Sequence, residues 1–253
     1  MARPPGFQSI LSAFILAILI GTGSLASAAI LIPQNLSSSD RVAVLRIIGM
    51  GTSAKILSDP YPLGGYDGFE AGVSVESLPT DDLGRLGAHL SSPQQDVSYP
   101  KVTLGKGLYN NIDVFVQFTP YNRQDELSQF SGIVRWGFYQ AQFLPLSASI
   151  LVHANNGNVG NVMTTRSYGV DLIGGMNVTN VALFGGAGYV ESTGTFAGGA
   201  SGITDSGRLE TETVGGLHTV VGANIRILEN GFFALQIDRY TVPVFSAKLG
   251  VRF

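Results

Sequence analysis

The sequence contains no cysteine, few charged residues and only one long apolar run. Without cysteine among its 253 residues, the chain has no disulfide scaffold, zinc–thiolate site or iron–sulfur cluster. Charged residues make up 13% of the chain, about half the share of a typical soluble domain. The net charge of −3 does not indicate a nucleic-acid partner. Because only one segment approaches ~18 continuous apolar residues, a helical membrane bundle is disfavoured as well.

The single apolar run lies at the N-terminus and has the features of a secretory signal peptide. Arg3 precedes an apolar core over residues 10–20, and the small residues Ala26 and Ala28 form an A-x-A pattern. A basic start, a short apolar core and such a cleavage site are typical of exported proteins. We therefore predict a signal peptide over residues 1–28. An uncleaved membrane anchor is the alternative, which the shortness of the core disfavours.

Residues 29–66 lack the alternation of the later sequence and predict a lead-in to it. A Ser-Ser-Ser-Asp run offers helix N-caps, and apolar residues recur at helical spacing between Val42 and Ile48. Two glycines then follow, which commonly end helices. We predict a periplasmic lead-in, helical or irregular, or a plug, with a short helix over residues 39–49. A strand over residues 42–48 is the alternative.

From residue 67 to the C-terminus, apolar residues alternate with small or polar ones. Alternation of this kind over about ten residues is typical of a β-strand with one apolar face. Glycine, at 33 residues, is also unusually frequent and falls largely within these segments and the loops between them. The segments lie at about 68–78, 99–107, 112–120, 130–139, 145–154, 165–174, 178–190, 211–223, 231–241 and 244–253.

The connections between these segments alternate between long and short. Long polar gaps such as 79–98 and 191–210 are separated by tight ones such as 108–111. Long loops on one rim, short turns on the other and strands of about ten residues are typical of outer-membrane barrels. We predict an all-β fold over residues 67–253, an antiparallel up-and-down transmembrane β-barrel of about ten strands. Eight or twelve strands, and a soluble β-sandwich, are the alternatives.

Aromatic residues near the ends of the expected strands support the membrane interpretation. Interfacial girdles of aromatic side chains are typical of proteins that span a bilayer. The non-apolar strand face is made of small and polar residues, and the whole chain has four lysines, whereas a soluble sheet usually exposes many charges. The girdle candidates are Tyr99, Trp136, Tyr139, Tyr168, Tyr189, Tyr240 and Phe253.

With its signal peptide, its alternating strands and its last residues Val251-Arg252-Phe253, the chain resembles the small outer-membrane β-barrel proteins of Gram-negative bacteria. The resemblance is architectural and indicates no subfamily. It implies a location in the cell outer membrane, contact with outer-membrane lipid and lipopolysaccharide, and the barrel assembly machinery as a partner. It also implies that Leu249, Val251 and Phe253 form the signal that this machinery reads.

Strand parity places a set of ionisable side chains in the lumen of such a barrel. Acids and bases in the set nearly balance, a barrel of about ten strands is narrow, and unpaired buried charge is costly. We therefore expect these groups to pair and to fill the interior. They are Glu70, Glu76, Lys101, Asp113, Arg135, His153, Asp171, His218, Asp238, Lys248 and Arg252.

These features favour a structural or surface-interaction role through the long loops 79–98 and 191–210. A narrow pore for small hydrophilic solutes, lined by the same charges, is the alternative. A hydrolase similar to the omptins is a third possibility, with His153 paired to Asp81, Asp82 or Asp238 as a general base. The sequence predicts no enzyme, no metal, no cofactor and no nucleic-acid partner.

Overall fold

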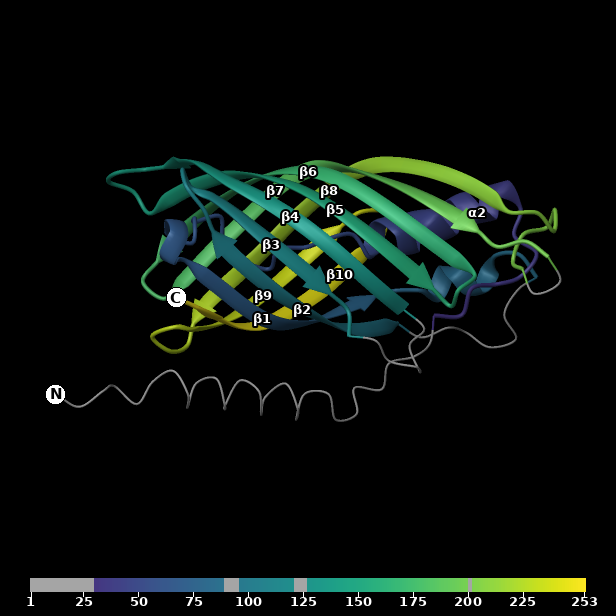
Figure 1. Cartoon of the computed structure of the whole chain (residues 1–253), viewed down its shortest axis with the longest axis horizontal. Helices are drawn as coiled ribbons and strands as arrows, with labels where there is room; N and C mark the ends of the chain where they lie inside the picture. Colours follow the sequence, from purple (N-terminus) through teal and green to yellow (C-terminus); the bar gives the residue numbers. More distant parts are fainter. Residues whose placement is uncertain (1–29, 89–95, 121–126, 200–201) are drawn as a thin grey trace.

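The computed structural model describes residues 30–88, 96–120, 127–199 and 202–253, and the expected signal peptide lies outside these ranges. Within them, ten antiparallel strands form one closed barrel (Figure 1). Each strand pairs with its neighbours in sequence, and β1 closes the barrel by pairing with β10. The prediction of an all-β up-and-down barrel with about ten strands is therefore confirmed.

The ten strands match the ten alternating segments in number and order. Their bounds are Phe69–Leu78 (β1), Val97–Gly107 (β2), Ile112–Phe118 (β3), Leu127–Gln140 (β4), Leu146–Val159 (β5), Met163–Val178 (β6), Val181–Phe196 (β7), Glu210–Arg226 (β8), Gly231–Arg239 (β9) and Pro243–Arg252 (β10).

We call the end of the barrel that carries the connections after β1, β3, β5, β7 and β9 the long-loop end, and the opposite end the short-turn end. The strands β5 to β8 extend further at the long-loop end than the sequence pattern indicates. They have 14 to 17 residues, and β7 continues to Phe196. Their outward side chains there are polar, so apolar alternation fades although the backbone pairing continues. The outward hydroxyls of Thr193 and Thr213 lie 3.1 Å apart across β7 and β8. These ends therefore form a hydrated extension of the barrel wall.

Elsewhere the outer face of the barrel is apolar. Val170, Leu172 and Leu183 are about half exposed, as are many other large apolar side chains on the barrel wall. Monomeric soluble proteins rarely expose apolar patches larger than a few hundred Å², whereas a barrel in lipid presents an apolar band around its circumference. In the described part of the chain, no helix has the length and apolar character needed to cross a membrane.

Five of the seven expected girdle aromatics lie on this outer face, and two do not. Trp136, Tyr139, Tyr168, Tyr189 and Phe253 are 41–61% exposed. Tyr99 and Tyr240 are buried in the lumen, so their assignment to the girdle was wrong. Tyr99 has the same parity as the inward-facing Lys101, and both phenol hydroxyls have partners inside the barrel.

The N-terminal helix forms where the caps indicate it. The α2 helix (Ser38–Val44) continues into a π-helical turn, η1 (Leu45–Gly49). Ser37 caps α2 in a capping box with Asp40, which satisfies backbone N–H groups that the first turn leaves unpaired. The expected helix over 39–49 is thus confirmed, and the alternative of a strand over 42–48 is wrong.

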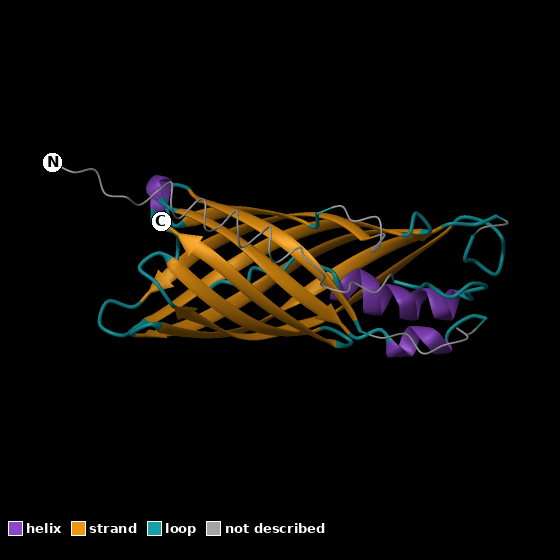
Figure 2. Ribbon diagram, turned by 90° about the horizontal axis from the view of Figure 1, so that it is seen from below, coloured by secondary structure: helices purple, strands orange, loops and turns teal. Residues whose placement is uncertain are grey.

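The position of this segment differs from the expected periplasmic lead-in. The α2 helix lies at the long-loop end of the barrel, opposite to the C-terminus (Figure 2). Every residue from Ile47 to Pro60 is buried, and the chain returns to the short-turn end before η2 (Gly65–Asp67) and β1. The segment therefore lies inside the barrel as the plug alternative has it, and the alternative of a periplasmic helix outside the barrel is wrong. We refer to residues 44–63 as the lumen segment.

Apolar contacts pack the lumen segment against the inner wall. Leu45, Ile48 and Met50 belong to a core with inward side chains from the long-loop half of the barrel, including Phe196 and Val214. Ala54, Ile56 and Leu63 join a second cluster with inward side chains of β3 to β8. Burial of these apolar residues explains why an apolar stretch folds into the barrel rather than extending into water.

Candidate functional site

The contacts of the lumen segment with charged side chains of the wall form three groups, and the first surrounds Glu76. The Lys55 ammonium lies 2.9 Å and the Lys101 ammonium 3.0 Å from its carboxylate oxygens. The Tyr99 hydroxyl donates to the same carboxylate at 2.9 Å. Lys55 also donates to the carbonyls of Gly51 and Ser53 within the segment. One wall carboxylate therefore holds a lysine of the segment and a lysine of β2.

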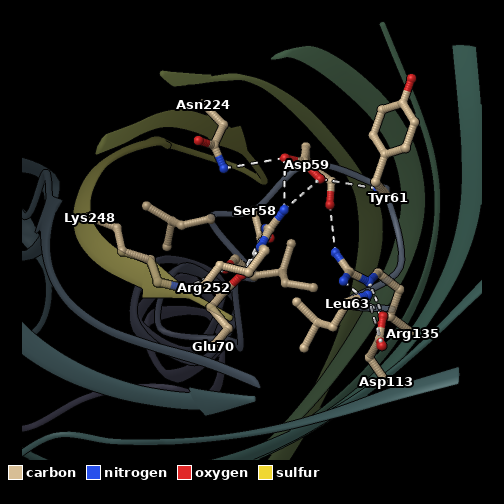
Figure 3. A network of polar contacts seen from close by, with 12 residues as sticks. Ser58, Asp59, Tyr61, Leu63, Glu70, Asp113, Arg135, Asn224, Lys248 and Arg252 are labelled. Atoms are coloured by element: carbon tan, nitrogen blue, oxygen red, sulfur yellow. Dashed lines mark hydrogen bonds and ion pairs between the residues drawn. The ribbon is translucent and has the colours of Figure 1, made fainter. Parts of the chain in front are cut away.

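The second group centres on Asp113 and Arg135, on the adjacent strands β3 and β4 (Figure 3). Arg135 donates from Nε and Nη2 to one oxygen of Asp113, at 2.9 and 2.8 Å. The other Asp113 oxygen accepts from the backbone N–H of Leu63 at 3.1 Å. Arg135 Nη1 donates to the backbone carbonyl of Asp59. This wall pair thus binds backbone groups of the segment on both sides of Pro60.

The third group lies near the short-turn end, around Glu70 and Arg252 (Figure 3). Glu70 accepts from Lys248 at 2.6 Å, from Arg252 Nη2 at 2.8 Å and from the Ser58 hydroxyl at 3.1 Å. Arg252 also bonds the Asp59 carboxylate, at 3.2 and 3.3 Å, and the Ser58 hydroxyl. The segment is therefore fixed by its own charged and polar side chains at this end.

A separate chain of interacting histidine and aspartate side chains runs across the inner face of the wall, near the middle of the lumen. Asp171 lies 3.1 Å from His153 Nε2 and 2.6 Å from His218 Nδ1. The other nitrogen of His218 lies 2.9 Å from Asp238, and the His218 ring stacks on Tyr240 with centroids 4.3 Å apart. All of these side chains are buried.

This histidine chain does not have the geometry of a hydrolytic site. His153 meets Asp171 rather than Asp81, Asp82 or Asp238, and Asp81 and Asp82 lie in the η3 turn (Asp81–Arg85) in the long loop after β1. The cavity beside the chain has a volume of about 10 Å³, enough for about one water molecule. A general base must reach the proton it abstracts, and a substrate has no room here. In the described residues, no group of three or more metal-binding side chains is arranged to hold an ion.

All eleven side chains assigned to the lumen from strand parity take part in ion pairs or His–carboxylate contacts. Ten of them are buried, and the Arg252 side chain is 25% exposed at the short-turn end. The sequence reasoning missed three partners, Lys55, Ser58 and Asp59, which the lumen segment supplies. Lys55 and Asp59 are the only charged residues between Arg46 and Asp67, and isolated charges in an apolar stretch were the available signal.

The residues assigned to the assembly signal lie at the end of β10. Leu249 and Phe253 are 52% and 41% exposed, and Val251 is partly exposed on the same outward parity. They are therefore accessible from outside the barrel, and their recognition by assembly machinery stays a prediction.

No protein-family model matches this sequence, and no curated protein matches it. Solved structures similar to it include Ail, the attachment invasion locus protein of Yersinia pestis, at 13% identity and a TM-score of 0.32, covering 74% of this chain and 97% of that one. The N-terminal β-barrel domain of Pseudomonas aeruginosa OprF has 12% identity and a TM-score of 0.34, covering 75% and 99%. The KdgM porin has 8% identity and a TM-score of 0.35, covering 74% and 98%. Likeness at this level assigns the chain to none of these proteins.

Proposed function

We propose that this protein is an outer-membrane β-barrel whose own N-terminal segment closes the lumen, and that it acts through its long-loop face. The observation that carries the proposal is the uninterrupted burial of residues 47–60 inside the closed barrel. The apolar outer face supports the membrane location, because only a closed barrel or a helix satisfies its backbone groups in lipid.

The ion pairs of the lumen make the closed form the stable one. Withdrawal of the lumen segment would remove Lys55 from Glu76 and Asp59 from Arg252. Loss of one partner from a buried ion pair typically costs about 3–5 kcal/mol. Spontaneous opening to a pore is therefore unfavourable, which supports a structural or surface-interaction role over passage of solutes.

The long-loop face is an ordered platform in its described parts. Arg41 on α2 bridges Asp205 and Glu212, with both ion pairs at 3.0 Å. Leu36 pairs with Thr204 as a β-bridge, and the carbonyl of Gln34 accepts from Ala88 N–H. The chain before α2 thus joins two long loops, and binding residues are often found on loops that a rigid scaffold holds.

Conductance measurement on the purified protein in planar bilayers tests the proposal. We expect the full barrel to give no steady channels, whereas a variant with residues 44–60 replaced by a short Gly-Ser linker should conduct. The folded state of both proteins is checked by heat-modifiable migration in gels. Steady, salt-dependent channels from the full protein would contradict the closed lumen and favour the narrow pore.

A further inference from the structure

A cavity of about 260 Å³ opens at the short-turn end of the barrel. It lies between the end of the lumen segment, the turns that follow β6 and β8, and the end of β10. We call it the mouth cavity. Pockets for small molecules usually have volumes of about 300–1,000 Å³, so this one has room for a single small compound. The lining residues used below are Asn177, Asn180, Asn224, Arg226, Glu229 and Phe232.

Two of the charges that line the mouth cavity are already neutralised within the protein. Asp59 is bonded by Arg252 and, at 3.4 Å, by the amide of Asn224 (Figure 3). Arg252 is further paired with Glu70. These groups fix the floor of the cavity and have little net charge to offer a ligand.

Two other charges are unpaired. Among the residues that the structure describes, the Arg226 guanidinium and the Glu229 carboxylate make no hydrogen bond or ion pair, either with each other or with another group. Both residues are exposed and line the same cavity. The cavity therefore presents one free cation and one free anion, the complement of a compound with both charges.

The rest of the lining suits a compound with amide groups. Asn177, Asn180 and Asn224 each carry an amide, which supplies donors and an acceptor in one plane and so matches a peptide bond. Leu63 and Phe232 add an apolar area for an aliphatic side chain. A neutral sugar would leave Arg226 and Glu229 without partners, and a polyanion would find one free cation, Arg226, beside the free Glu229 carboxylate.

We propose that the mouth cavity binds a small zwitterion of the amino-acid class, a free amino acid or a short peptide. Its carboxylate bonds Arg226, its ammonium group bonds Glu229, and, in a peptide, the amide groups bond Asn177 and Asn180. The site does not require an open lumen, because the floor lies at the end of the lumen segment. Binding of the zwitterion can therefore be disproved while the closed-barrel proposal holds, and the closed-barrel proposal can be disproved while binding holds.

Calorimetric titration of the detergent-solubilised protein with the dipeptide L-alanyl-L-alanine tests the proposal. We expect saturable binding, weakened about tenfold or more when the amino group is acetylated or the carboxylate is amidated, since each change removes a charge-assisted hydrogen bond. Arg226→Gln should weaken dipeptide binding by a similar factor and abolish the preference for carboxylate over amide. Glu229→Gln should likewise abolish the preference for the free amino group over its acetylated form.

Arg239→Gln is the matched control, because Arg239 is an exposed cation on the outward face of the opposite end of β9. It should leave the affinity unchanged, and all variants should retain heat-modifiable migration. The absence of saturable dipeptide binding to the full protein would overturn the proposal. Binding that Arg226→Gln leaves unchanged, or tighter binding of a neutral disaccharide than of the dipeptide, would overturn it as well.

Discussion

Glu76 compensates two buried ammonium groups with a single carboxylate. Its partners Lys55 and Lys101 are 0% and 1% exposed at their side chains, and the Tyr99 hydroxyl donates to the same group. Isolated charges are very unfavourable in such surroundings, so the cluster is stable only while the carboxylate is present. Because Lys55 belongs to the lumen segment and Lys101 to β2, this one residue connects the segment to the wall.

We predict that Glu76→Gln destabilises the barrel by about 3–5 kcal/mol, because it leaves two buried lysines without a counter-charge. Denaturant unfolding in detergent micelles measures the change. Asp82→Asn is the control, since Asp82 and Arg85 form a pair whose side chains are 66% and 82% exposed, and exposed pairs contribute little. Equal stability of Glu76→Gln and the unmodified protein would contradict the assigned role of Glu76.

Glycine beside the histidine chain shows why this residue is frequent in the sequence. A Cβ atom on Gly169 would lie 2.3 Å from His153 Nε2, and one on Gly188 would lie 2.1 Å from an oxygen of Asp171. Both glycines are therefore required for the close approach of neighbouring strands to these side chains. In a narrow lumen that also contains a chain segment, small residues on the inward parity leave the necessary space.

Among the secondary-structure elements, the strands could be predicted from the sequence, whereas the sequence left the lumen segment undecided between a periplasmic helix and a plug. Strand alternation is a local property, so the sequence from Phe245 to Phe253 is enough to tell which side chains of β10 face outward. The helix caps are local as well. The location of residues 44–63, however, depends on contacts between residues far apart in sequence, such as Lys55 with Glu76 and Asp59 with Arg135. A short apolar helix has the same pattern wherever it packs.

The contact between η1 and the wall gives a direct test of this location. Ser192 on β7 lies close to Gly49, so that a Cβ atom on residue 49 would be 2.5 Å from the Ser192 hydroxyl oxygen. We predict that the double variant Gly49→Cys, Ser192→Cys forms a disulfide under mild oxidation, with a small shift of the Leu45 side chain. Because the natural chain has no cysteine, non-reducing mass spectrometry of proteolytic fragments detects the linkage without background.

The matched control is Gly49→Cys with Ser246→Cys, where Ser246 is a buried residue of β10. The η1 turn packs against β6, β7 and β8, so this second pair should stay reduced. A linkage in both pairs, or in neither, would show that the segment does not hold the described position.

In the molecule as a whole, the two ends of the barrel carry different features, and an apolar outer face lies between them. The apolar outer face fits lipid, the polar extensions of β5 to β8 and the α2 helix lie at the long-loop end, and the mouth cavity lies at the other. In bacterial outer-membrane barrels the short turns face the periplasm and the longer loops face outward. In the proposed outer-membrane location, the lumen segment would therefore bring residues 30–43 to the cell surface, although the chain resumes as β1 on the periplasmic side.

Cysteine labelling on intact Gram-negative cells that express the protein decides this orientation. Ser39 is exposed on α2, and Tyr109 is 74% exposed in the short turn after β2. We predict that a membrane-impermeant maleimide labels Ser39→Cys on intact cells and labels Tyr109→Cys only after the outer membrane is disrupted. The reverse pattern would mean that the long-loop face points inward, and labelling of both on intact cells would contradict a membrane-embedded barrel. Only an outer-membrane barrel threaded by its N-terminal segment gives surface access to residue 39 while residue 109 stays protected.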